Sequence, residues 1–174
     1  MENTGVRQDF YLMQLILEAL YSFSKNFDKL SNRMFCGMTA KQYRLIMAIQ
    51  ALPRDSATIV NIANALGTTK QNLNHMIPVL EKKGYISRRP NQNDSRAVNL
   101  EVTETGEDAM LEFSETFVIL IRDIFDSLAV EELEALWGVL RKMRYCGSAN
   151  CTDFVDSINV LFKEKYPAIV KRGE

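Results

Sequence analysis

The most constraining feature of this 174-residue sequence is a pair of short helical patterns followed at once by a basic hairpin, between Thr58 and Gly106. The first pattern opens at Thr58, whose hydroxyl can accept hydrogen bonds from free backbone N–H groups. It closes at Gly67, which can adopt the left-handed conformation that ends a helix. Its apolar residues recur at spacings of three and four: Ile59, Ile62, Ala63 and Leu66. The pattern predicts a short amphipathic helix and a tight turn.

A second helix is expected directly after this turn. Thr69 is a plausible N-cap, although Thr68 and Gln71 could instead form a capping box. The buried face is predicted to hold Leu73, Met76, Ile77 and Leu80, and the opposite face Gln71, Asn74, His75 and Pro78. Lys82 and Lys83 suit the negative end of the helix dipole, and Gly84 ends the helix. Pro78 removes one backbone hydrogen bond; it is either a tolerated kink or a bend that re-aims the helix.

The hairpin follows the second helix. Residues 85–89 read as one strand, and residues 97–102 as another, because Val98, Leu100 and Val102 alternate with more polar positions, the period of a half-buried strand. The residues between them are rich in turn formers. Thr103 is then expected to cap a new helix with carboxylates in its first turns. Two helices and a hairpin in this order predict a winged helix-turn-helix.

The same stretch resembles the wing signature of the multiple-antibiotic-resistance regulator (MarR) family. The resemblance lies in Gly84-Tyr85-Ile86-Ser87-Arg88-Arg89-Pro90, in Asp94-Ser95-Arg96-Ala97-Val98, and in Leu100, Thr103 and Gly106. It is dense over residues 39–106 and looser to about Tyr145. It implies a dimeric, ligand-responsive transcription regulator, usually a repressor. The implied fold is mainly α, with a small two- or three-stranded β wing and long dimerisation helices at both chain ends.

Charge is distributed as a nucleic-acid partner would require, although the net charge is only −1. Residues 68–98 carry six basic and two acidic side chains, a net charge of +4, whereas residues 101–134 carry eleven acidic side chains and one basic, a net charge of −10. The acidic segment should point away from DNA. The expected DNA contacts are Thr69, Lys70, Gln71, Asn72, Asn74, His75, Arg88, Arg89, Asp94 and Arg96. Arg96 is expected at the tip of the hairpin, where a guanidinium can reach a minor groove. The resemblance gives Asp94 the role of holding the wing in shape by pairing with an arginine.

Long amphipathic patterns flank the winged segment. The apolar stripe of residues 6–33 includes Met13, Ile16, Leu20 and Phe23, and another stripe runs from Thr103 to about Leu128. A further helix is expected around residues 133–143, although Ala129 stands where a capping Ser or Thr would be expected. Thr152 is expected to open a last helix. We therefore divide the chain into an N-terminal dimerisation helix (1–36), a winged-helix domain (37–103) and C-terminal dimerisation helices (104–174), which would bind double-stranded DNA as a homodimer on a near-palindromic operator.

The resemblance also implies a cavity for a small aromatic or lipophilic effector between the dimerisation helices and the winged domain. Its expected lining is Phe10, Met13, Phe35, Tyr43, Met47 and Phe113. Ordinary core packing is an equally good reading of each residue taken singly. Cys36, Cys146 and Cys151 form no metal pattern, and the last two could bridge. A redox-sensing regulator that uses Cys146 and Cys151 therefore stays an alternative, as does a winged helix that binds protein rather than DNA.

Other classes of protein fare poorly. The one histidine, His75, lies on the presumed groove face, so no catalytic triad can be argued, and no glycine-rich phosphate loop occurs. We expect no enzyme, no metal and no cofactor. No apolar run approaches the roughly 20 residues that span a membrane, and the N-terminus lacks the pattern of a signal peptide. A cytoplasmic protein is the simplest interpretation.

Overall fold

The computed structural model describes residues 4–34, 37–91, 97–143, 158 and 160. The chain divides into two compact units, Met1–Ala40 and Lys41–Glu174. The first unit consists of one long helix, α1 (Thr4–Met34), without an internal proline. This helix exposes many large apolar side chains along its length: Phe10, Tyr11, Leu12, Met13, Leu15, Ile16, Leu17, Tyr21, Phe23 and Leu30.

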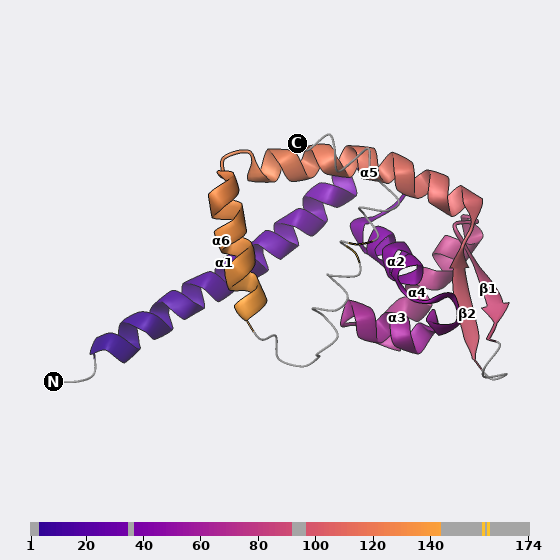
Figure 1. The fold of residues 1–174 in the computed structure, drawn as a ribbon, viewed down its shortest axis with the longest axis horizontal. Coiled ribbons are helices and arrows are strands. Elements are labelled where there is room, and N and C mark those ends of the chain that lie inside the picture. Colours follow the sequence, from indigo (N-terminus) through magenta and orange to yellow (C-terminus); the bar gives the residue numbers. More distant parts are fainter. Residues whose placement is uncertain (1–3, 35–36, 92–96, 144–157, 159, 161–174) are drawn as a thin grey trace. The chain divides into compact units, whose positions relative to one another are not determined.

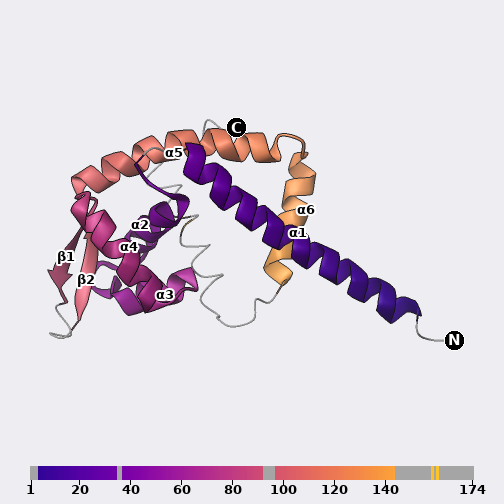
Figure 2. The same ribbon diagram turned by 180° about the vertical axis from the view of Figure 1, so that it is seen from behind.

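The second unit starts one residue into α2 (Ala40–Ala51), and a short 3-10 turn, η1 (Arg54–Ser56), follows. The helix-turn-helix follows as α3 (Ile59–Leu66) and α4 (Lys70–Lys82). Strands β1 (Ile86–Pro90) and β2 (Val98–Val102) then form an antiparallel hairpin, in which Ile86 pairs with Val102 and Pro90 with Val98. Figures 1 and 2 show α2, α3 and α4 gathered beside this hairpin. The order confirms the winged helix-turn-helix predicted from the sequence.

Three threonines fix where the helices of this unit begin. The side chains of Thr58, Thr69 and Thr103 each accept a hydrogen bond from the backbone N–H three residues ahead. Thr69, and not Thr68, is therefore the N-cap of α4. Gly67, with a φ of 61°, adopts the left-handed conformation that ends α3. The helix α4 runs through Pro78, whose side chain is exposed.

The core of the second unit is the face that α2, α3, α4 and β2 share. Leu45, Ile46, Ile62, Leu73, Ile77, Leu80 and Leu100 are fully or almost fully buried. The predicted alternation along β2 is wrong in one respect, since Val98 is exposed while Asn99 is completely buried. The reason is tertiary: Thr58 forms a β-bridge with Asn99, and the Asn91 amide donates a hydrogen bond of 3.1 Å to its side-chain oxygen.

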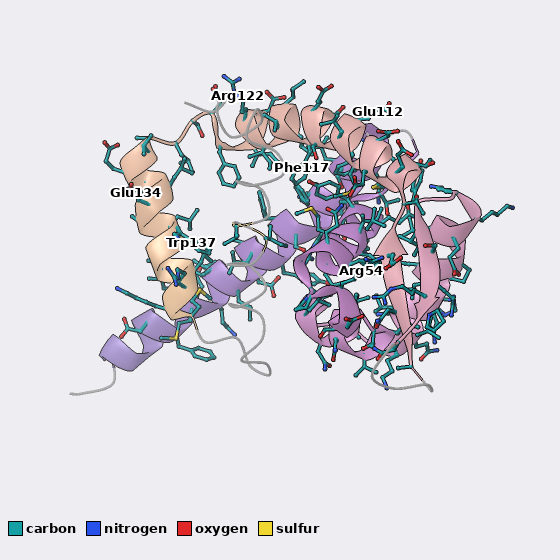
Figure 3. All side chains as sticks on the ribbon, turned by 45° about the vertical axis from the view of Figure 1, so that its right-hand side comes forward. Arg54, Glu112, Phe117, Arg122, Glu134 and Trp137 are labelled. Atoms are coloured by element: carbon teal, nitrogen blue, oxygen red, sulfur yellow. The ribbon has the colours of Figure 1, made fainter. Side chains whose placement is uncertain are left out.

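Two further helices complete the described chain, α5 (Glu104–Phe125) and α6 (Val130–Lys142). The ring of Tyr43 on α2 stacks on Phe113 of α5 with centroids 4.3 Å apart, and its hydroxyl lies 3.2 Å from the Ser114 hydroxyl. Glu112 and Arg122 point outward from α5, whereas Phe117 points to the other side (Figure 3). At the start of α6 the carboxylate of Glu132 accepts a hydrogen bond from the backbone N–H of Ala129. This is the reciprocal half of a capping box, and the hydroxyl half is absent because the N-cap is an alanine.

Candidate nucleic-acid interface

The helix α4 presents a polar face at its N-terminal end. Lys70, Gln71, Asn74 and His75 are all exposed, while Leu73 and Ile77 anchor the opposite face in the core. No acidic residue occurs in the sequence between Asp55 and Glu81. Amide side chains can hydrogen-bond to the edge of adenine, and lysine can pair with phosphate. The first two turns of α4 therefore carry the chemistry that reading a DNA groove requires.

Two of the predicted contact residues also hold the turn before α4 in place. The Thr69 hydroxyl accepts a hydrogen bond of 3.2 Å from the backbone N–H of Asn72, so this hydroxyl caps the N-terminus of α4. The side-chain amide of Asn72 donates to the Thr68 hydroxyl at 3.2 Å. Both residues thus fix the geometry in which Gln71 and Asn74 are presented.

The wing is joined to α4 by an ion pair. On β1 the guanidinium of Arg88 forms two hydrogen bonds with the carboxylate of Glu81, of 2.7 Å and 3.2 Å. Bidentate pairs of this kind fix orientation as well as distance. Arg88 is about half exposed, so it can meet DNA, but it also sets the position of the wing relative to the end of α4.

A second ionic cluster lies at the base of the wing. Arg89 donates to the backbone oxygen of Arg54 at 2.9 Å and to the carboxylate of Asp55 at 3.0 Å. Its Nε lies 2.6 Å from a carboxylate oxygen of Glu101, to which Arg54 also donates, at 2.9 Å. The hydrogen bond from Arg54, strengthened by the positive charges of both arginines, lowers the pKa of Glu101.

This cluster was missed in the sequence because its members lie on three separate segments. Arg89 was predicted as a DNA contact, but its side chain is only 18% exposed and binds η1 and β2. The Asn91 amide adds a hydrogen bond of 2.9 Å to the backbone oxygen of Asp55. The one sequence signal for this ionic cluster is that arginines and acidic residues recur near the predicted strands. Whether Arg89 also reaches DNA stays a prediction.

The remaining predicted residues fall into three groups. Asp94, Arg96 and Phe35 lie outside the described residues, as do the three cysteines and most of the segment after Met143. Among the other expected effector residues, Tyr43, Met47 and Phe113 are buried in the second unit. Phe10 and Met13 belong to α1 in the first unit, where both are more than half exposed.

Within the described ranges, no three His, Cys, Asp or Glu side chains gather as a metal site. None of the described helices is long and apolar enough to cross a membrane.

The sequence and the fold were compared with known proteins. Residues 37–97 match the sequence model of the MarR family. The transcriptional repressor MprA of Escherichia coli is 23% identical over 136 residues, which cover 78% of this chain and 76% of that protein.

Solved structures agree with these matches at the level of the fold. A mutant of E. coli MarR bound to operator DNA superposes with a TM-score of 0.69 and 23% identity, over 78% of this chain and 98% of that one. The organohalide-sensing regulator RdhR-CbdbA1625, in its 2,4-dichlorophenol-bound form, gives a TM-score of 0.68 and 16% identity, over 76% of this chain and 79% of that one. The fold is thus the mainly helical, two-stranded winged fold that the sequence predicted.

Proposed function

We propose that this chain, whose residues 37–97 match the sequence model of the MarR family, is a winged-helix transcription repressor that binds a near-palindromic operator as a homodimer. The family is one of regulators and not of enzymes. A repressor of this kind acts where the DNA is, which places it in the cytoplasm.

One observation carries the DNA-binding proposal: the polar, acid-free N-terminal face of α4. A winged helix used to bind protein would call for an apolar or acidic face at this position. Here Lys70, Gln71, Asn74 and His75 instead offer hydrogen-bond groups suited to bases and phosphates. The relatives MprA and MarR, a repressor and a protein crystallised with operator DNA, support the same assignment.

The exposed apolar surface of α1 and α6 supports the homodimer. On α6, Val130, Trp137 and Val139 are between 45% and 66% exposed, and α1 exposes residues of the same kind. Large apolar surfaces of this kind mark interaction sites. A second copy of the chain would bury them and would present two α4 helices to the two halves of a palindrome.

We also propose a small aromatic or lipophilic effector. The Tyr43, Phe113 and Phe117 rings lie within 4.3 to 5.7 Å of one another between α2 and α5, a setting in which a second aromatic molecule could pack after modest rearrangement. The fold relative RdhR-CbdbA1625 was crystallised with 2,4-dichlorophenol, which makes this compound a reasonable first probe. The phenol class is excluded if neither 2,4-dichlorophenol nor other chlorinated or unsubstituted phenols shift the melting temperature of the protein or alter its affinity for DNA.

The deciding experiment is protection mapping on the DNA that flanks the protein's own gene. A protected, near-palindromic segment that the purified protein binds far more tightly than a scrambled duplex would support the proposal. Equal affinity for both duplexes would contradict it.

A further inference from the structure

A hollow of about 430 Å³ lies in the second unit beside the polar face of α4. It is lined by Lys41 and Arg44 of α2, by the α3–α4 turn Leu66–Thr68, and by Asn72 and Met76 of α4. Asn72 directly follows Gln71 in α4, is exposed and is itself a predicted DNA contact, so the hollow begins at the edge of the surface that is proposed to enter DNA.

Among the lining residues that the structure describes, the charged ones are both positive. They are Lys41 and Arg44, and both are exposed. Arg44 forms no ion pair with any residue that the structure describes. Residues 37–80 contain four basic side chains and a single acidic one, Asp55. That carboxylate already binds Arg89 at 3.0 Å.

Two neutral donors at the hollow already have partners. The Asn72 amide donates to the Thr68 hydroxyl, and the backbone N–H of Thr68 donates to the Ala63 carbonyl at 2.9 Å. The main attraction for a charged ligand therefore comes from Lys41 and Arg44, which favour an anion. A guanidinium suits a phosphate best, because its donors form a fork that matches two phosphate oxygens.

The position of the hollow indicates where this phosphate comes from. When the second helix of a helix-turn-helix lies in the major groove, the first helix crosses the sugar-phosphate backbone. Here the first helix is α3, and its C-terminal end and the following turn line the hollow together with α2. We propose that the hollow receives a phosphate of the DNA backbone, bound by Arg44 and Lys41, so that the DNA-contacting surface extends from α4 onto α2. This inference rests on the proposed DNA-binding function.

A phosphate contact makes a specific prediction, because phosphates carry no direct sequence information. Arg44→Gln should weaken binding to the protected duplex and to a scrambled duplex of the same length by the same factor. Each phosphate contact that is lost should lower the slope of log affinity against log salt by about 0.9. Between 50 and 200 mM salt, the ratio of wild-type to variant DNA affinity should fall roughly 3.5-fold for each contact that is lost. The Lys41→Gln, Arg44→Gln double variant should show about twice that change in slope.

The experiment is a fluorescence anisotropy titration of the full chain against both duplexes at a series of salt concentrations. Arg122→Gln is the matched control, because it removes an equal charge from the exposed side of α5 (Figure 3). The control should leave the slope unchanged, and melting curves should show that all variants are folded.

Two results would overturn the inference alone. The first is a wild-type slope in the Arg44→Gln variant; if wild type still prefers the protected duplex, the proposed function survives this result. The second is a loss confined to the protected duplex, which would make Arg44 a base-reading residue. Competition by inorganic phosphate at constant ionic strength that disappears in Arg44→Gln would support a phosphate site at Arg44. Absence of any wild-type DNA binding would remove the proposed function and the inference together.

Discussion

Gly106 lies where the neighbouring backbone leaves no room for a β-carbon. It lies in the first turn of α5, and a β-carbon there would overlap the backbone carbonyl oxygen of Tyr85 and lie 2.9 Å from a methyl group of Val102. The same junction is tied by hydrogen bonds from Thr103, whose hydroxyl donates to the Gly84 carbonyl and whose N–H donates to that of Tyr85. These contacts link the end of α4, the wing and the start of α5 to one another.

We predict that Gly106→Ala lowers the free energy of unfolding by roughly 1–3 kcal/mol or more, because backbone must move to admit the methyl group. Gly138→Ala is the matched control, since a β-carbon there meets nothing within 4 Å inside α6. The control should raise stability by about 0.5–1 kcal/mol through helix propensity. Urea unfolding curves of the two variants measure both effects, and equal stability of the two would contradict the argument.

Glu101 gives a prediction about pH. Its pKa is lowered in the folded protein, chiefly by the hydrogen bond from Arg54. A carboxylate with a lowered pKa contributes stability that is complete above its unfolded pKa of about 4.3 and is lost as the pH falls through the folded value. Because the Arg54 side chain is 77% exposed, solvent screens its attraction to Glu101, and Glu101→Gln should cost less than about 1 kcal/mol at pH 7.

The difference in free energy of unfolding between wild type and Glu101→Gln should therefore shrink as the pH is lowered from 7 to 3. Urea unfolding midpoints across this pH range measure it. Glu112→Gln, an exposed residue of α5 with no ion pair among the described residues, serves as the control. A gap between wild type and Glu101→Gln that stayed constant down to pH 3 would show that the carboxylate charge is not what stabilises the cluster.

At the scale of elements, α4 and the wing have separable tasks. The helix α4 presents Gln71 and Asn74 on its exposed face. Thr69 caps its N-terminus, and the buried Leu73 holds it against the core. The wing is fixed to this helix by Arg88 and Glu81, and to η1 by Arg89. We therefore expect base reading to belong to α4, and we expect the wing to supply electrostatic attraction and orientation.

We expect Gln71→Ala or Asn74→Ala to cost roughly 1–3 kcal/mol on the operator and to relax the preference at particular base pairs. Arg96→Ala, in the wing, should weaken binding to every duplex and reduce its salt dependence. Titrations against operator, single-base mutants of it and scrambled DNA distinguish the two patterns. Asn64→Ala, an exposed asparagine of α3, should leave the ratio of operator to scrambled affinity unchanged. If the α4 variants lose affinity equally on operator and scrambled DNA, α4 does not read bases.

At the scale of the whole molecule, the apolar surface of α1 is the dominant feature. At about 1.5 Å per residue, a helix of 31 residues extends roughly 46 Å. Leu17 and Met13 are each 64% exposed on it. Water contact over such a length is unfavourable, and a second chain is the simplest cover.

The expected result is a dimer at micromolar concentration, measured by light scattering or sedimentation, that Leu17→Asp converts to monomer. In the dimer this carboxylate would be buried without a partner, and the free-energy cost of removing its charge from water would exceed what the apolar contacts at this position contribute. Val60→Asp places the same charge on α3, at a residue 43% exposed, and should leave the dimer intact. Wild-type protein that is monomeric at micromolar concentration would contradict the proposed assembly.

The sequence by itself determined the local structure of the winged segment. Helix caps depend on a hydroxyl and the backbone three residues ahead, so Thr58, Thr69 and Thr103 could be predicted as start points. The left-handed turn at Gly67 is likewise a property of one residue. The exposed face of α4 followed from helical periodicity alone, and with it the placement of Gln71 and Asn74.

Only the tertiary structure decided which charged residues of the domain are already bound to one another. Arg88 and Arg89 are adjacent in the sequence, yet one binds Glu81 on α4 and the other binds Asp55 and Glu101. The burial of Asn99, the contact of Gly106 with Tyr85 and the cationic hollow under α2 are equally non-local. Each depends on the distance between segments that are 20 to 50 residues apart, which periodicity and capping do not specify, because they act over only a few residues.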